Sequence, residues 1–191
     1  MLELVALPLN HDAPSLGQLV GQAQAGQRDS FEQLVKQCQG RILRLCLRML
    51  GGSEEARDVA QETFVKAFLH LGQLQPDRSP LPWLTTVATR LCLNRLRSQS
   101  RRPQEPLSPE CEPVAHDLPL DQAWLRKENQ AQVQRALLQL AESSRAVVVL
   151  YYLEEWNCRD IGETLGMSES NVKVTLHRSR EKLRRWLCPT T

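Results

Sequence analysis

Apolar residues recur along this chain every three or four positions, which is the period of an α-helix. In the first hundred residues this pattern predicts four helices. The first is capped by Ser15 and ends near Gly26, and Asp29 is the expected cap of the second. The "GGS" at 51–53 stops the second helix, and Ser53 starts the third. A loop with three prolines at 72–82 precedes the fourth, which runs from about 83 to 98.

The expected inward faces of these helices are continuous apolar stripes, which predict a helical bundle. The second helix carries Phe31, Leu34, Val35, Cys38, Ile42, Leu45, Cys46 and Met49. The third carries Val59, Ala60, Thr63, Phe64, Ala67, Phe68 and Leu71.

Helical periodicity resumes at about 121–141 and again from near Ser143. A short helix at about 158–165 follows, and Gly166 is suited to the left-handed residue that ends a helix. Ser168 can cap the last helix, and Gly162 leaves room for a close crossing. A helix, a short glycine-containing turn and a second helix form a helix-turn-helix motif.

One valine interrupts the polar face of the last helix, "SNVKVTLHRSREKLRRWL" at 170–187. At 100° per residue, Val172, Leu176 and Ser179 point to one side, whereas Val174 lies among basic residues on the other. In the major groove of DNA such a side chain can pack against a thymine methyl group. Lys173, His177, Arg178, Arg180, Lys182, Arg184 and Arg185 surround or extend this face and can donate to bases or phosphates. The alternative is an exposed valine without a role.

Charge is distributed unevenly along a chain whose net charge is only +2. Residues 89–102 contain five arginines and no acid, and residues 168–188 have a net charge of +4. Two separated basic segments suggest a polyanion that is contacted at two places. The alternative is that both are ordinary solvated helix faces.

Between the two helical regions, residues 103–121 hold five prolines, five acids and no base. This composition predicts an extended connector with few contacts between the parts that it joins. We therefore expect an all-α protein with an N-terminal domain at 16–102, an acidic, Pro-rich linker at 103–120 and a helix-turn-helix domain at 121–188. The linker can span about 60 Å when extended.

No motif of an enzyme or a cofactor site is present in the sequence, and the four histidines are scattered. Cys111 and His116 are two candidate metal ligands in the linker, which are too few to predict a metal site. We expect no catalysis, no cofactor and no metal. The six cysteines form no C-x-x-C pair and are expected to be reduced. Without a signal peptide or an apolar run of membrane-spanning length, the expected location is the cytoplasm, with no membrane insertion.

Three segments resemble, in order, the bacterial sigma factors of the extracytoplasmic-function (ECF) group of the sigma-70 family. "SEEARDVAQETFVKAF" (53–68) resembles the second conserved segment of that family, and "PWLTTVATRLCLNRLRSQSRR" (82–102) resembles the promoter-melting segment. "DIGETLGMSESNVKVTLHRSREKL" resembles the C-terminal recognition segment. The resemblance covers roughly residues 16–102 and 121–187.

The resemblance implies a transcription initiation factor, of the kind that serves stress responses, that directs core RNA polymerase to promoters. Its polymerase-binding residues, which meet the clamp helices of the large subunit, would be Asp58, Gln61 and Glu62. The −10 element would be contacted by Trp83, Arg90, Asn94 and Arg97. The −35 element would be contacted by Ser168, Ser170, Lys173, Val174, His177, Arg178, Arg180 and Arg184.

Further partners that the resemblance implies are the polymerase flap on the −35 side and an anti-sigma factor. The 72–82 loop would receive a base flipped from the non-template strand, yet it lacks the aromatic residue that many members have. Arg90 stands where Asn is common and Asn94 where an acid is common, which should alter the preferred −10 sequence. The alternative function is a helix-turn-helix regulator that acts without polymerase.

Overall fold

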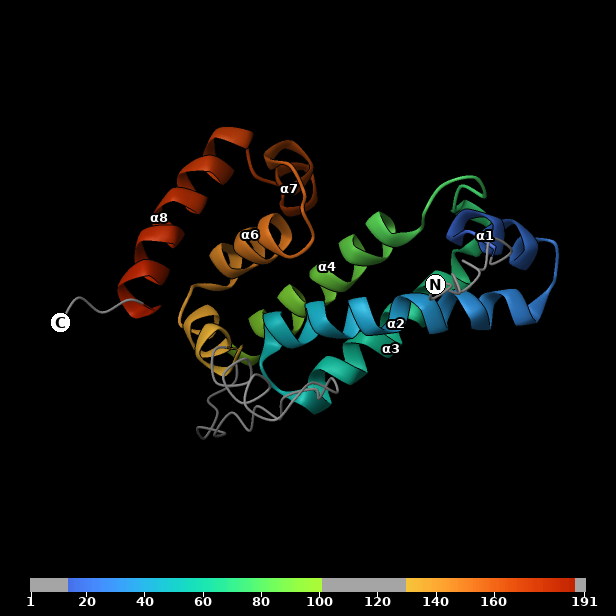
Figure 1. The fold of residues 1–191 in the computed structure, drawn as a ribbon, viewed down its shortest axis with the longest axis horizontal. Coiled ribbons are helices and arrows are strands. Elements are labelled where there is room, and N and C mark those ends of the chain that lie inside the picture. The colour runs from blue at the N-terminus through green and yellow to red at the C-terminus, as the bar shows by residue number, and fades with distance from the viewer. Residues whose placement is uncertain (1–13, 101–129, 188–191) are drawn as a thin grey trace, which may run out of the picture.

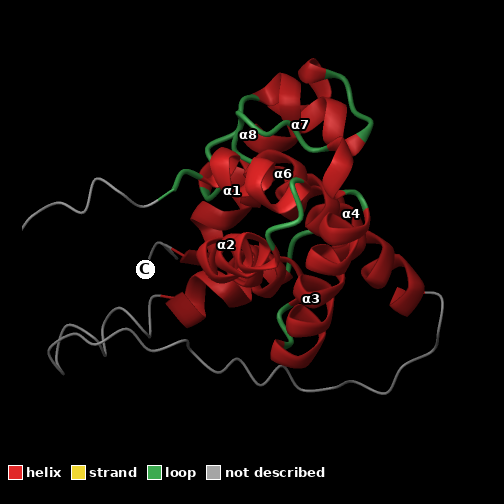
Figure 2. Ribbon diagram, turned by 90° about the vertical axis from the view of Figure 1, so that its right-hand side faces the viewer, coloured by secondary structure: helices red, strands yellow, loops and turns green. Residues whose placement is uncertain are grey.

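The computed structural model describes residues 14–100 and 130–187, and every regular element in these two stretches is helical (Figures 1 and 2). The prediction of an all-α chain with two helical parts is thereby confirmed. The linker, including Cys111 and His116, lies outside the described residues.

The N-terminal unit contains α1 (Leu16–Gln24), α2 (Arg28–Leu50), α3 (Ser53–Leu69) and α4 (Leu81–Ser100), with a short 3-10 turn, η1, at Leu71–Gln73. The central helix is α2, which packs against each of the other three. The predicted cap at Ser15 is confirmed, because its side chain accepts from the backbone N–H of Gln18. The cap predicted at Asp29 is wrong. The helix already begins at Arg28, and Asp29 lies in its first turn, where a carboxylate interacts favourably with the helix dipole.

The apolar stripes of α2 and α3 form most of the core of the N-terminal unit, as their spacing predicts. Two predicted members depart from the stripe of α3: Leu71 lies beyond the end of the helix, in η1, and Phe68 is 60% exposed. The spacing of Leu71 continues the helical period, which predicts its place in the stripe, but the helix ends at Leu69. Ala67 is the last fully buried residue of the stripe. Phe68 comes next in the chain and is therefore rotated by 100° around the helix, so its ring lies at the edge of the bundle. There it meets Phe31 edge to face, with ring centroids 5.2 Å apart.

The C-terminal unit contains helical residues 130–138, then α6 (Glu142–Tyr152), α7 (Cys158–Leu165) and α8 (Glu169–Leu187). Asn157 caps α7, and Gly166 ends it with a φ of 68° in the left-handed region, as predicted. Ser168 also caps α8 as predicted, because its hydroxyl accepts from the N–H of Asn171 at 3.2 Å.

The two units pack against each other, which the composition of the linker does not predict. Helix α6 contacts α2 and α4 on one side and α7 and α8 on the other (Figures 1 and 2). Arg41 forms an ion pair of 2.7 Å with Glu154, whose side chain is 5% exposed. The side-chain amide of Gln134 donates to the carbonyl oxygen of Leu47 at 2.9 Å. One continuous core therefore joins the units, and the expectation of few contacts between them is wrong.

Candidate nucleic-acid and protein interfaces

The helix-turn-helix is fixed by a close contact between α7 and the turn that follows it. A Cβ atom on Gly162 would lie 2.5 Å from the carbonyl oxygen of Met167, so only glycine fits there. The carbonyl oxygen of Gly162 accepts from the N–H groups of Gly166 and Met167. The close approach predicted for Gly162 is real, but its partner is the backbone of the turn. This contact sets the direction in which α8 leaves the turn.

Helix α8 separates an apolar side from a basic side at the phase predicted from its sequence. Val172, Leu176 and Ser179 are buried against α6 and α7, whereas Val174 is 46% exposed. All of the residues predicted to contact the −35 element are exposed: Ser168, Ser170, Lys173, Val174, His177, Arg178, Arg180 and Arg184. The motif therefore presents a continuous outward surface.

Two of these cations already have partners within the chain. Lys173 pairs with Glu169 at 2.5 Å, and this hydrogen bond raises the pKa of Lys173 and lowers the pKa of Glu169. The guanidinium of Arg180 donates to the hydroxyl of Tyr152 and lies over the rings of Tyr151 and Tyr152, 5.8 and 5.5 Å from their centroids. A guanidinium has five N–H donors, so Arg180 can still bind phosphate while these aromatics hold it in place.

The residues predicted to contact the −10 element lie on one side of α4. Arg90, Asn94 and Arg97 are exposed and follow one another at intervals of four and three residues, which is the spacing of a single helical face. Trp83 lies two turns earlier on the same side, but it is half-buried against the core and near His70, with ring centroids 6.3 Å apart. This face offers two cations and an amide, with one edge of an indole.

Polar and apolar residues share the outward face of α3. Asp58, Gln61 and Glu62 are exposed, as expected for a polymerase-binding set. The same face continues for two more turns with Val65, Phe68 and Leu69, which are 52%, 60% and 72% exposed. We call these six residues the α3 docking face. Sequence reasoning missed the apolar half because it placed Phe68 in the core, although Val65 and Leu69 already lay off the stripe.

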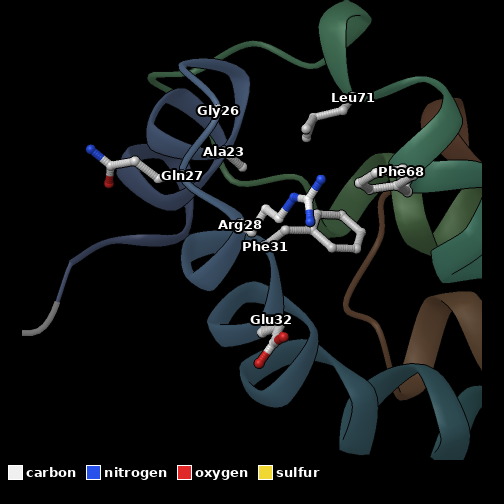
Figure 3. Close-up of a pocket in the computed structure, with 8 residues that line it drawn as sticks. All are labelled: Ala23, Gly26, Gln27, Arg28, Phe31, Glu32, Phe68 and Leu71. Carbon is white, nitrogen blue, oxygen red and sulfur yellow. The ribbon is translucent and has the colours of Figure 1, made fainter.

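A cavity of about 540 Å³ adjoins the apolar half of the α3 docking face. The rings of Phe31 and Phe68, which touch edge to face, form one side of it, and Leu71 lies above them in Figure 3. Its lining residues are Ala23, Gly26, Gln27, Arg28, Phe31, Glu32, Phe68 and Leu71. Contiguous exposed apolar surface of this kind is typical of sites that bind a protein, a membrane or a ligand.

The cysteines of the described stretches are buried or half-buried thiols without disulfide partners: Cys38, Cys46, Cys92 and Cys158. Burial raises the pKa of Cys38 to about 11, although Arg41 opposes the shift. Hydrogen bonding with Cys46 and burial raise the pKa of Cys92. Within 14–100 and 130–187 no three His, Cys, Asp or Glu side chains are grouped to hold a metal, and no helix is long and apolar enough to cross a membrane.

Comparison with known families and proteins matches both units. The family model of sigma-70 region 2 matches residues 34–102, and that of sigma-70 region 4 matches residues 130–183. The ECF RNA polymerase sigma factor SigW of Bacillus subtilis is 32% identical over 178 residues, which cover 88% of this chain and 94% of SigW. The RNA polymerase sigma-H factor of Pseudomonas aeruginosa is 31% identical over 185 residues, which cover 90% and 93% of the two chains.

Solved structures agree with these matches. CnrH, in complex with the cytosolic domain of CnrY, superposes with a TM-score of 0.62 and 28% identity over 92% of this chain and 99% of CnrH. The sigma factor RpoE of Bartonella quintana, in complex with the anti-sigma factor NepR, has a TM-score of 0.66 over 85% of this chain and 99% of RpoE. At 17% identity, that likeness concerns the fold alone.

The two matched family models and the relatives that cover most of this chain define a bacterial transcription initiation factor. The chain belongs to the sigma-70 family of RNA polymerase sigma factors, in its ECF group. It is not an enzyme, and it directs RNA polymerase to specific promoters. The family therefore decides between the two functions that the sequence left open, and the regulator that acts without polymerase is excluded.

Proposed function

We propose that three helix faces each bind a different partner during initiation. The α3 docking face binds core polymerase, α4 contacts the −10 element and α8 contacts the −35 element. The observation that carries this proposal is that each predicted set lies on one helix or at its start, exposed except for the half-buried Trp83, and that the opposite side of each helix is buried. We further propose that the chain acts in the cytoplasm, where polymerase and promoters are.

Core polymerase is expected to meet the α3 docking face with a surface that is both polar and apolar. Asp58, Gln61 and Glu62 supply acceptors, so the partner needs matching donors such as arginine side chains on its clamp helices. Val65, Phe68 and Leu69 supply apolar area that becomes buried in the complex. Because the face is already exposed in the folded chain, it can bind without rearrangement of its own helix.

The −35 element is expected to lie along the basic side of α8. Val174 packs against a thymine methyl group, and Arg178 donates to a neighbouring base edge. Arg180 and Arg184 contact phosphates on either side, which position the helix without reading sequence. The polymerase flap would support this unit from the side away from the DNA.

Reading both elements together requires the two units to separate. Elements about 17 base pairs apart are separated by about 58 Å, at about 3.4 Å per pair. Helices in contact lie about 8–10 Å apart, axis to axis. Since α6 contacts both α4 and α8, the axes of the two reading helices come within roughly 20 Å of each other in this packed form. We propose that the holoenzyme breaks the pair Arg41–Glu154 and uses the linker to reach the second element.

An anti-sigma factor is proposed to act by covering the α3 docking face. The sigma factor RpoE was solved in complex with the anti-sigma factor NepR, and CnrH in complex with the cytosolic domain of CnrY. An exposed strip of Val65, Phe68 and Leu69 beside an apolar cavity is a surface that a partner helix can bury. An anti-sigma helix that occupies it would exclude polymerase by direct competition.

The polymerase-binding assignment is tested by removing the polar half of the α3 docking face. Asp58→Ala with Gln61→Ala should weaken binding to core polymerase at least tenfold, about 1.4 kcal/mol. Both residues are exposed, so the free energy of unfolding should change by no more than about 0.5 kcal/mol for each. Fluorescence titration of core polymerase with labelled chain measures the affinity. Leu69→Ser should weaken binding in the same assay through the apolar half.

The matched control for this test is Gln37→Ala with Gln39→Ala, two exposed changes on α2 away from the docking face. It should retain the wild-type affinity. If the Asp58 and Gln61 variant also binds core polymerase as tightly as the wild type, α3 is not the docking helix.

The −35 assignment predicts three mutational effects that differ in kind. Val174→Ala should weaken holoenzyme binding at one or two base positions of the element, with little change in stability. Arg178→Ala should cost about 1–3 kcal/mol at a single base. Arg184→Ala should weaken all sequences alike and reduce the slope of affinity against salt by about one. Binding of holoenzyme to a series of point-mutated promoters distinguishes these three effects. If Val174→Ala leaves the base preference unchanged, Val174 does not contact a base in the major groove.

A further inference from the structure

The loop between α3 and α4 is attached to α1 by hydrogen bonds. The side-chain amide of Gln24 donates one hydrogen bond to the carbonyl oxygen of Leu71 and one to that of Leu74, both at 2.8 Å. Gln24 ends α1, and these acceptors lie 47 and 50 residues further along the chain. One amide thus uses both of its N–H donors to fix the start of the loop.

The middle of the same loop lies directly on the surface of α1. A Cβ atom on Gly17 would lie 2.9 Å from backbone atoms of Pro76, Asp77 and Arg78, and one on Gly21 would lie 3.2 Å from the Cβ atom of Pro76. Glycine inside a helix is unfavourable, so two of them in a nine-residue helix require a reason. The close approach of the loop backbone supplies it.

A small separate core completes the attachment. Leu74 of the loop is buried together with Leu19 and Val20 of α1 and with Leu34 of α2. Beyond Leu74, residues 75–79 are all exposed. The loop therefore has an anchored base and a solvent-facing tip, and residues 76–78 of that tip rest on the helix.

We propose that α1 is a positioning element for promoter opening, in which Gly17 and Gln24 hold the 74–80 loop ready to receive an unpaired base of the −10 element. The inference rests on the proposed −10 role of α4 and this loop, and it adds a helix that precedes the matched region 2. Residues 72–82 contain no aromatic side chain on which a base could stack. A loop without stacking has to bind through a shape that is set in advance, because ordering a free loop on binding would weaken the complex.

The test replaces Gln24 with glutamate, which has the same shape but donates no N–H and places a carboxylate beside two carbonyl oxygens. The probe is a single-stranded oligonucleotide with the non-template −10 sequence, bound to holoenzyme. Removing the base that enters the loop, by an abasic substitution, should weaken wild-type binding at least tenfold at that one position. In Gln24→Glu holoenzyme this position-specific loss should shrink to less than threefold. The affinity of the variant chain for core polymerase should be unchanged.

Two further variants distinguish positioning from general damage. Gln33→Glu makes the same change at an exposed position of α2. Its holoenzyme should still lose affinity at least tenfold when the base that enters the loop is removed. Gln24→Lys places N–H donors again beside the carbonyl oxygens of Leu71 and Leu74, at the end of a flexible side chain. It should recover much of the position-specific loss of binding that the abasic substitution causes in the wild type. If circular dichroism shows that Gln24→Glu does not fold, Gly17→Ala takes its place, since its added Cβ displaces the loop and leaves the Gln24 donors intact.

The outcomes separate this inference from the proposed function. If the abasic substitution does not weaken oligonucleotide binding to wild-type holoenzyme at any one position, the −10 role of the loop is contradicted. The inference about α1 is then contradicted as well. The other outcome is that wild-type holoenzyme loses affinity at that position and that a folded Gln24→Glu or Gly17→Ala variant loses just as much. This result overturns the positioning role of α1 and leaves the −10 role of the loop standing.

Discussion

Replacing Arg145 with methionine is expected to lower the free energy of unfolding by about 3 kcal/mol or more. Arg145 is only 6% exposed, and its guanidinium donates to the carbonyl oxygens of Leu137, Leu138 and Leu140 at 3.1, 2.9 and 3.2 Å. It also donates to the carbonyl oxygen of Met49 in the N-terminal unit. Burial lowers the pKa of Arg145, and Glu142 opposes the shift.

The size of this effect follows from what the carbonyl groups lose. The carbonyl groups of Leu138 and Leu140 lie at and just beyond the end of helical segment 130–138, where the last carbonyls have no partner within the helix. The carbonyl oxygen of Leu137 also accepts from the N–H of Leu140 at 3.1 Å, so the loss falls on the other two and on that of Met49. Methionine has a similar length but no donor, so buried carbonyls become unsatisfied at about 1–3 kcal/mol each. Denaturant unfolding measures the loss. Arg135→Met, an exposed arginine in the same segment, is the control and should change stability by no more than about 0.5 kcal/mol. Equal losses in the two variants would show that Arg145 is not a structural anchor.

Gly162→Ala should destabilise the chain by about 1–3 kcal/mol and disturb −35 recognition. The added Cβ would meet the carbonyl oxygen of Met167 at 2.5 Å, and a backbone atom cannot move aside as the end of a flexible side chain can. Since this contact directs α8, its displacement should weaken −35 binding of the holoenzyme even where the chain still folds.

Gly40→Ala on α2 is the matched comparison for Gly162→Ala. Its new Cβ would meet only the end of the Arg44 side chain, at 3.4 Å. Because alanine favours a helix interior over glycine, Gly40→Ala should leave stability unchanged or raise it by up to about 1 kcal/mol. The thermal unfolding temperature should therefore fall in Gly162→Ala and stay the same or rise in Gly40→Ala. A Gly162→Ala chain that unfolds at the wild-type temperature contradicts the close contact.

Local pattern in the sequence was sufficient to place the helices and the phase of α8. The exposure of Val174 follows from counting 100° per residue from Val172 and Leu176, because the two sides of a helix differ so strongly in burial. Caps at Ser15 and Ser168 were also predictable, since a serine hydroxyl at a helix start accepts from a nearby backbone N–H. These features depend on neighbours within one or two turns.

Contacts between distant segments could not be read from the same pattern. The bonds from Gln24 to Leu71 and Leu74, and the pair Arg41–Glu154, join residues 47 to 113 positions apart. The composition of a linker says nothing about whether the faces on either side of it fit together, which explains why the shared core was missed. Phe68 was misplaced for a related reason, because a residue at the edge of a stripe is buried only if a neighbour covers it.

Transcription from promoter DNA by purified core polymerase, with and without this chain, tests the central claim most directly. We expect initiation at defined sites only when the chain is present, with a shared pair of sequence elements near −10 and −35 upstream of those sites. The Asp58→Ala, Gln61→Ala variant should reduce this initiation in parallel with its affinity for polymerase. Start sites that are the same without the chain, or a chain that binds promoter DNA while polymerase starts nowhere defined, would contradict the account.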